Sequence, residues 1–188
     1  MKLSVEEMQE NLQNGWWNTN PIQRFRGSVW YPFAHDFAYV IGHGDVRKGA
    51  GLIAALSPQK SWDVNRRLAV DASQGLFWGQ VGNALDKARA IYDGADPATV
   101  LPMSKKTGHF YMNILDPMDP NWVTIDRHAI RAARCDWDDG DPRITDKDYA
   151  NYVLAYQKAA ANEGVVPSVF QAGIWGYARE KYVPRRAR

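Results

Sequence analysis

The sequence predicts an all-α fold in a single domain. Apolar residues recur at helical spacing through most of the chain, whereas alternating strand patterns are hard to find. The chain has no internal repeat, no Gly/Ser linker and no low-complexity tract. Its 188 residues lie within the usual size of one domain and are enough to bury a real core.

The first half of the chain predicts four helices. Ser4-Val-Glu-Glu7 has the capping-box arrangement, a side-chain acceptor followed three residues later by Glu, and opens an amphipathic helix that ends near Gly15. The aromatic-rich segment 22–41 contains Pro32, which predicts one broken helix. Two further helices are expected over 49–56 and 61–77.

The second half predicts five more helices. Asn83 is expected to cap a helix over 84–92, and Thr124 or Asp126 to cap a helix that ends near Cys135. The other helices are expected over 103–115, 145–162 and 167–182. Within the single domain we distinguish N-terminal helices (1–48), a core (49–182) and a basic tail (183–188).

Composition excludes several classes of protein. No apolar stretch approaches the roughly 18 residues of a membrane span, and the N-terminus lacks the apolar region of a signal peptide, so a cytoplasmic protein without membrane contact is expected. Cys135 is the only cysteine, which excludes an internal disulfide, a cysteine-based zinc site and a four-cysteine iron–sulfur cluster. A net charge of +2 permits an anionic partner without requiring one. We expect a monomer with no cofactor and no metal.

Three segments contain residues suited to DNA chemistry. The Gln59 amide can both donate to and accept from base edges, although a surface turn explains Leu56-Ser-Pro-Gln59 equally well. Lys105-Lys106-Thr107-Gly108 opens a predicted helix, where backbone N–H groups and two lysines can bind a phosphate. An ordinary solvated lysine pair is the alternative, and a half-buried lysine there could instead act as an amine nucleophile.

The third segment, Thr124 to Arg131, places a carboxylate at a predicted helix start. Capping alone would explain Asp126. A capping carboxylate is also held rigidly and kept ionised, as is needed to stabilise a developing cation or to orient a water molecule. The two roles are compatible.

In this order, the segments resemble the helix-hairpin-helix DNA glycosylase superfamily, which contains endonuclease III and the adenine glycosylases. Leu56-Ser-Pro-Gln59 is similar to that family's Leu-Ser-x-Gln turn, and 83–91 to the helix before its hairpin. Leu101-Pro102 with Lys105-Lys106-Thr107 is similar to its Leu-Pro, glycine hairpin and Arg-Lys-Thr. Ile125-Asp126-Arg127-His128 with Arg131 is similar to its Val-Asp-Thr-His and later Arg, and 171–179 to its final core helix.

The resemblance implies a compact two-lobed helical fold and an enzyme that cleaves the N-glycosidic bond of a flipped, damaged or modified base. Asp126 would stabilise the sugar cation, Lys106 could form an imine and Gln59 would fill the gap in the duplex. The implied DNA contacts are Lys105, Thr107, Gly108, Arg127, His128 and Arg131. Other candidates for phosphate contacts are Arg134, Lys181, Arg185, Arg186 and Arg188. The candidate pocket residues, for which a core position is the commoner role, are Trp62, Phe110, Tyr111 and Trp175.

The hairpin departs from the family pattern, because Met103-Ser104 stands where Gly-x-Gly lets the backbone approach a phosphate. With the His109-Phe-Tyr-Met-Asn113 stretch, this is similar to short bacteriophage relatives, which would place the protein in the host cytoplasm. Three alternatives follow. They are a phage enzyme of thymine or pyrimidine hypermodification on the same fold, a non-catalytic DNA-binding or host-inhibitory protein, and a metal-dependent phosphohydrolase using His35, Asp36, Asp126 and His128.

Overall fold

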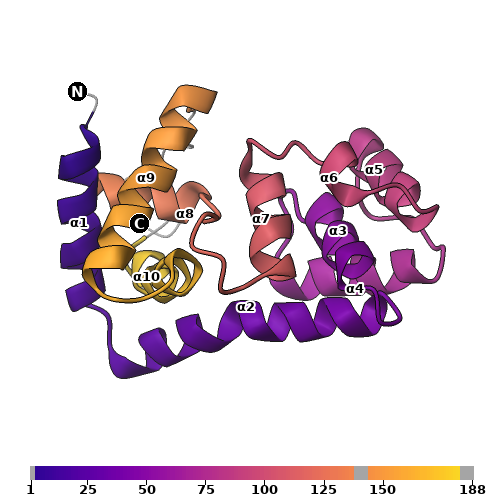
Figure 1. Cartoon of the computed structure of the whole chain (residues 1–188), viewed down its shortest axis with the longest axis horizontal. Helices are drawn as coiled ribbons and strands as arrows, with labels where there is room; N and C mark the ends of the chain where they lie inside the picture. The colour runs from indigo at the N-terminus through magenta and orange to yellow at the C-terminus, as the bar shows by residue number, and fades with distance from the viewer. Residues whose placement is uncertain (1–2, 138–143, 183–188) are drawn as a thin grey trace. The chain divides into compact units, whose positions relative to one another are not determined.

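The computed structural model describes residues 3–137 and 144–182, and in these ranges it contains helices and no strand (Figure 1). The expected all-α fold is therefore confirmed for the described residues. The chain divides into two compact units: unit 1 comprises Met1–Tyr31 and Met118–Arg188, and unit 2 comprises Pro32–Pro117. This division differs from the boundary at residue 48 drawn from the sequence. The basic tail 183–188 lies outside the described residues, as do Arg185, Arg186 and Arg188.

Unit 1 contains α1 (Val5–Trp17), α8 (Arg127–Arg134), α9 (Asp146–Asn162) and α10 (Pro167–Lys181), which pack against one another (Figure 1). Trp16 of α1 stacks on Phe170 of α10 with 4.9 Å between ring centroids. Gly173 makes this approach possible, because a Cβ atom there would lie 2.8 Å from the Trp16 ring. The aromatic core of unit 1 thus holds α10 in place beside α1.

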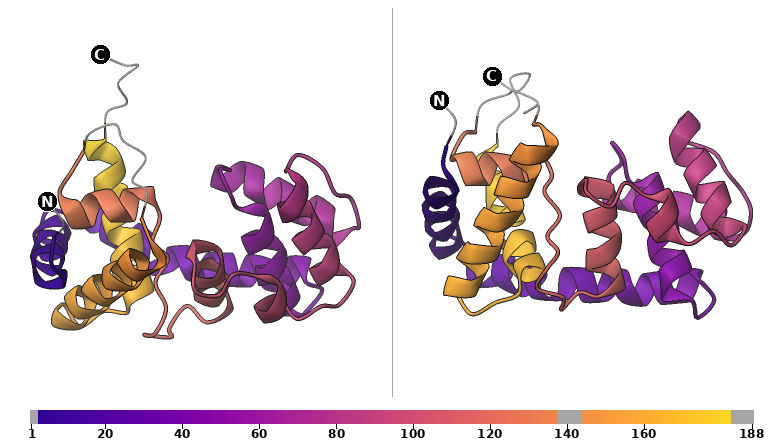
Figure 2. Two further views of the ribbon diagram at one scale, coloured as in Figure 1. Left: turned by 90° about the horizontal axis from the view of Figure 1, so that it is seen from above. Right: turned by 45° about the horizontal axis from the view of Figure 1, so that its top comes forward.

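Unit 2 is built around α3 (Val46–Leu56), whose residues from Gly49 to Leu56 are all buried. Four helices contact α3 (Figure 2). They are α4 (Trp62–Ser73), α5 (Gly82–Tyr92), α6 (Pro97–Val100) and α7 (Lys106–Leu115). A Cβ atom at Gly51 of α3 would lie 2.6 Å from Pro97 and 3.2 Å from Ile91, so this glycine allows two of the four helices to pack closely.

Helix α2 (Pro21–Ile41) continues through Pro32 without interruption, so the prediction of a broken helix was wrong. Proline removes one backbone N–H and frees the carbonyl four residues earlier. That carbonyl belongs to Ser28, and both Ser28 and Pro32 are exposed, so water can satisfy the freed group. None of the helices in the described ranges is both long and apolar enough to cross a membrane.

The predicted helix starts were only partly confirmed. Ser4 and Glu7 form the expected capping box, with the Glu7 N–H to Ser4 Oγ at 3.1 Å. Asn83 does not cap α5, because the helix starts one residue before it, at Gly82, and its N-cap Val81 makes no side-chain bond. Helix α4 ends earlier than expected, at Ser73, and α7 starts later, at Lys106.

Candidate functional site

The Asp126 side chain is held by two donors at the start of α8. Asp126 is the N-cap residue, and its Oδ1 accepts a hydrogen bond of 2.8 Å from the Ala129 N–H. Its Oδ2 accepts a second bond, of 3.0 Å, from the indole Nε1 of Trp175 on α10. The carboxylate is half-buried. Asp126 therefore caps α8 as predicted, and its second oxygen is fixed by a residue distant in sequence.

Two tyrosines of α9 anchor the backbone around Asp126. The Tyr149 hydroxyl accepts a hydrogen bond of 3.2 Å from the Ile125 N–H, and the Tyr156 hydroxyl donates one of 3.1 Å to the Ala129 carbonyl. Ile125 is also buried in the core of unit 1. The backbone on both sides of the carboxylate is thus fixed by packing and by hydrogen bonds.

The buried tyrosines of unit 1 respond to the charge of Asp126. Burial, and then the negative charge of Asp126, raises the pKa of the Tyr156 hydroxyl well above its usual value. Burial is also the main cause of the raised pKa values of Tyr31 and Tyr149, and Asp126 adds to both. These hydroxyls therefore stay neutral beside the carboxylate.

Beside Asp126, five side chains of the α8 and α10 segments form a chain of contacts in which two arginines flank three rings, in the order Arg179, Trp175, His128, Tyr182 and Arg131; we call it the α8–α10 stack. The His128 ring contacts Trp175 and Tyr182 edge to face, at centroid distances of 5.6 and 5.9 Å. The Arg131 guanidinium lies 4.1 Å from the Tyr182 ring, and that of Arg179 lies 5.2 Å from the Trp175 ring.

Two of the predicted DNA contacts in this region are buried in the folded chain, and they stay predictions. Arg131 is only 5% exposed and His128 only 8%, because both belong to the α8–α10 stack. Arg134 donates a hydrogen bond from Nε to the Tyr152 hydroxyl. Arg127 is exposed and remains available to a phosphate.

The start of α7, in unit 2, contains the predicted lysine pair. Lys105 is the N-cap residue and makes no side-chain capping bond, and both Lys105 and Lys106 are exposed. Lys106 is therefore exposed, rather than half-buried as the alternative of an amine nucleophile supposed. Thr107 is half-buried. Gly108 is buried, and a Cβ atom there would lie 2.3 Å from Met103 Cα, so the residue is needed for packing. The predicted phosphate contact at Gly108 stays a prediction.

The turn that carries Gln59 is exposed, and hydrogen bonds from Gln80 fix its backbone. Gln59 adopts a left-handed backbone conformation with φ of 59°, which is uncommon for a residue other than glycine. The Gln80 amide donates to the Leu56 and Pro58 carbonyls at 3.1 and 2.8 Å. The Gln59 side chain is thus presented to solvent from a fixed turn.

The candidate pocket residues are divided between the units. In unit 2, Phe110 and Tyr111 are buried in the core, and half-buried Trp62 contacts Phe37 at a centroid distance of 6.1 Å. Trp175 belongs to unit 1, where it binds Asp126. More widely, unit 1 carries Asp126, Arg127, His128, Arg131 and Trp175, and unit 2 carries Gln59, Trp62, Lys105, Lys106, Thr107, Gly108, Phe110 and Tyr111.

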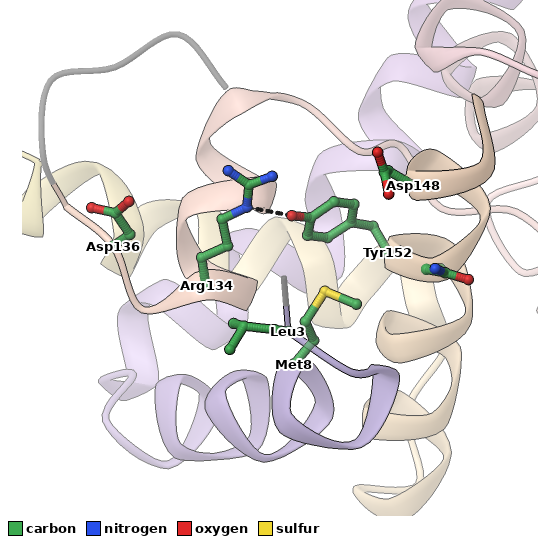
Figure 3. A pocket seen from close by; sticks show the side chains of 7 residues that line it. Leu3, Met8, Arg134, Asp136, Asp148 and Tyr152 are labelled. Carbon is green, nitrogen blue, oxygen red and sulfur yellow. Dashed lines mark hydrogen bonds between the residues drawn. The ribbon is translucent and has the colours of Figure 1, made fainter. Parts of the chain in front are cut away.

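Unit 1 also has a pocket of about 400 Å³ between α1, the end of α8 and the start of α9 (Figure 3). In the close-up, Arg134 points across the pocket to Tyr152, and Leu3 and Met8 lie on its apolar side. Asp136, Asp148 and Asn151 complete the lining. None of the predicted catalytic or base-pocket residues lies in this pocket.

The metal-dependent alternative has no site among the described residues. In this part of the chain no group of three or more His, Cys, Asp or Glu residues is placed to hold an ion. His35 Nδ1 instead donates to the carbonyls of Ile114 and Leu115, at 3.0 and 3.1 Å. His35 therefore has a structural role within unit 2.

Sequence reasoning did not foresee the bond between Trp175 and Asp126, or the places of Arg179 and Tyr182 in the α8–α10 stack. Trp175 and Arg179 are four residues apart on α10 and so share a face, which is the one signal that could have linked them. No curated protein and no solved structure matches this chain. One family model matches residues 1–182, nearly the whole chain. The chain therefore belongs to DUF7178, a family of unknown function.

Proposed function

We propose that this protein is a DNA N-glycosylase-like enzyme and that Asp126 is its catalytic carboxylate. The observation that carries the proposal is the fixation of Asp126 by the Ala129 N–H and the Trp175 indole. A carboxylate held in this way needs no reorganisation when positive charge develops nearby, which is the condition for electrostatic stabilisation of a transition state. The motif order from Leu56 to Arg131 supports DNA as the substrate.

In the proposed reaction the bond between the sugar C1′ and the base nitrogen breaks, and its electron pair leaves with the base. Positive charge then develops at C1′ and the ring oxygen, where the Asp126 carboxylate stabilises it. A water oxygen adds to C1′, and the proton that it loses balances the proton taken up by the departing base. Unit 1 supplies the group for this step, so the chemistry does not require Lys106.

Charges near Asp126 support a phosphate-bearing substrate. Arg127 and Arg179 are exposed, and neither forms an ion pair with a described residue. The Arg179 guanidinium lies over the Trp175 ring, which leaves its N–H edge available for a bidentate phosphate contact. Replacing either arginine with Gln should weaken DNA binding at all sequences and reduce its salt dependence.

The decisive experiment is mass spectrometry of bases released from a panel of modified DNA duplexes. The wild-type protein should release a base, and Asp126→Asn should lose this activity while its circular dichroism spectrum stays unchanged, because Asn keeps the capping oxygen but not the charge. Asp45→Asn is the matched control, since Asp45 is likewise a capping aspartate, on α3. Base release by Asp126→Asn at the wild-type rate would contradict the proposal.

Two further measurements separate the related activities. If Lys106 forms an imine, borohydride should trap a covalent adduct between the protein and an abasic duplex, and Lys106→Gln should form no adduct. If the enzyme releases bases but gives no adduct, water is the only nucleophile. A non-catalytic DNA-binding protein would release no base from any duplex and would bind DNA equally well with Asp126→Asn.

A further inference from the structure

His128 is a buried ring with no hydrogen-bond partner for its Nδ1 among the described residues. It is 8% exposed and lies between the edges of Trp175 and Tyr182. No residue in the described part of the chain hydrogen-bonds to its Nδ1. Buried polar atoms in proteins nearly always have a hydrogen-bond partner, so this arrangement calls for an explanation.

The charges around His128 favour the neutral ring. Burial lowers the pKa of His128 below its usual value, and the positive charges of Arg127, Arg131 and Arg179 lower it further. The Asp126 carboxylate acts in the opposite direction. Of these four charged groups in the described ranges, three come from the α8 segment and one, Arg179, from α10. An imidazolium in this place would be buried without a hydrogen bond at Nδ1, which is unfavourable.

Trp175 connects His128 to the carboxylate. Its ring packs against His128, and its Nε1 donates to Asp126 Oδ2 at 3.0 Å. The Arg179 guanidinium lies over the same indole. The orientation of the indole, and with it the second hydrogen bond of Asp126, therefore depends on how the His128 ring sits.

We infer that His128 is a positioning residue for Asp126: as a neutral ring it keeps the Trp175 indole on the carboxylate, and protonation of the ring releases the indole. A charged His128 ring leaves its place between Trp175 and Tyr182 for solvent or for the Asp126 carboxylate, and Trp175 then loses a packing partner. The positioning role of His128 rests on the proposed function only where base release is measured. The contact between Trp175 and Asp126 can be observed directly, without any activity.

The direct test follows the indole N–H resonance of Trp175 by NMR as the pH is lowered. Trp175→Phe identifies the resonance, and Asp126→Asn shows where it lies without the carboxylate. In the wild-type protein we expect the resonance to move towards the Asp126→Asn position in step with the titration of the His128 ring. In His128→Phe it should stay in place over the same range.

Two variants serve as controls. His43→Asn alters an exposed histidine of unit 2 in a left-handed conformation that Asn tolerates, and it should leave the wild-type titration unchanged. His128→Gln, which is neutral at every pH, provides a second test if His128→Phe does not fold. A Trp175 resonance that ignores the His128 titration, or that titrates equally in both His128 variants, would overturn the inference.

Base release supplies the second readout. The wild-type kcat should fall as the pH drops below the His128 pKa, and His128→Phe should shift this acid limb to lower pH. Trp175→Phe should lower kcat by about tenfold at neutral pH with little change in KM, because a lost orienting bond affects the chemical step. An unchanged acid limb in His128→Phe would contradict the inference. If the Trp175 resonance follows the His128 titration but no duplex releases a base, the positioning role is supported and the glycosylase proposal is rejected.

Discussion

Helices α8 and α7 begin in opposite ways. The start of α8 is filled by its own acid, since Asp126 accepts the Ala129 N–H and is then bound by Trp175. The start of α7 has no side-chain cap and carries two exposed lysines. A helix start attracts negative charge through its free N–H groups and its dipole. The α8 start therefore holds a fixed internal anion, whereas the α7 start suits an anion from outside.

The largest effect on stability should come from adding a side chain at Gly108, in the first turn of α7. Gly108→Ala would place a Cβ atom 2.3 Å from Met103 Cα, which is backbone and cannot give way. We expect a loss of about 3 kcal/mol in the free energy of unfolding, measured by urea denaturation. Gly15→Ala is the control: a Cβ in α1 would make ordinary contacts at 3.9 Å or more, so this variant should gain up to about 1 kcal/mol. Equal effects at both positions would show that Gly108 is not needed for packing.

Removing the N-cap side chain should lower stability at the α8 start but not at the α7 start. Asp126→Ala loses the bond to Ala129 and leaves the Trp175 N–H without its acceptor, which together should cost about 2 kcal/mol in unfolding free energy. Lys105→Ala at the N-cap of α7 should change stability by less than about 0.5 kcal/mol. Similar losses in the two variants would remove the difference between the starts.

A capping acid can also be moved to the α7 start. Lys105 has an extended backbone, with φ of -122° and ψ of 171°, which is the geometry of an N-cap residue. Lys105→Asp should raise the unfolding free energy by about 1 kcal/mol and weaken DNA binding, with a shallower dependence on salt. Lys147→Asp, an exposed lysine of α9, is the charge-matched control and should leave binding nearly unchanged. If DNA binding by Lys105→Asp depended more steeply on salt than binding by the wild-type protein, the α7 start would not be an anion site.

The smallest effect concerns pH. Because the pKa of His128 is lowered in the folded protein, the unfolded chain binds more protons between that value and the usual 6.5. The unfolding free energy should therefore fall as the pH drops below 6.5 and level off below the folded pKa. His128→Phe should remove this part of the pH dependence, whereas His43→Asn should retain it. Urea midpoints between pH 4 and pH 7 would test the prediction.

Local signals account for what the sequence could predict. The capping box at Ser4 and the cap at Asp126 involve residues three apart, so the pattern alone locates them. The bond between Trp175 and Asp126 joins residues 49 apart, and no local pattern indicates it. Arg131 was expected to contact DNA because it resembles the glycosylase family's Arg after Val-Asp-Thr-His, and a motif carries no information on burial. Its place beside Tyr182 depends on how α10 ends, which only packing decides.

The division of the chain constrains the order in which it can fold. Unit 2 is one continuous stretch, Pro32–Pro117, whereas unit 1 joins residues from both ends of the sequence. During synthesis from the N-terminus, all of unit 2 has been made before Met118 is added, so it can fold first. Helix α1 meets its partners last, because Leu12 and Trp16 are covered only once α9 and α10 exist. Until then its apolar face is open to solvent, and a ribosome stalled before α10 would present α1 to chaperones.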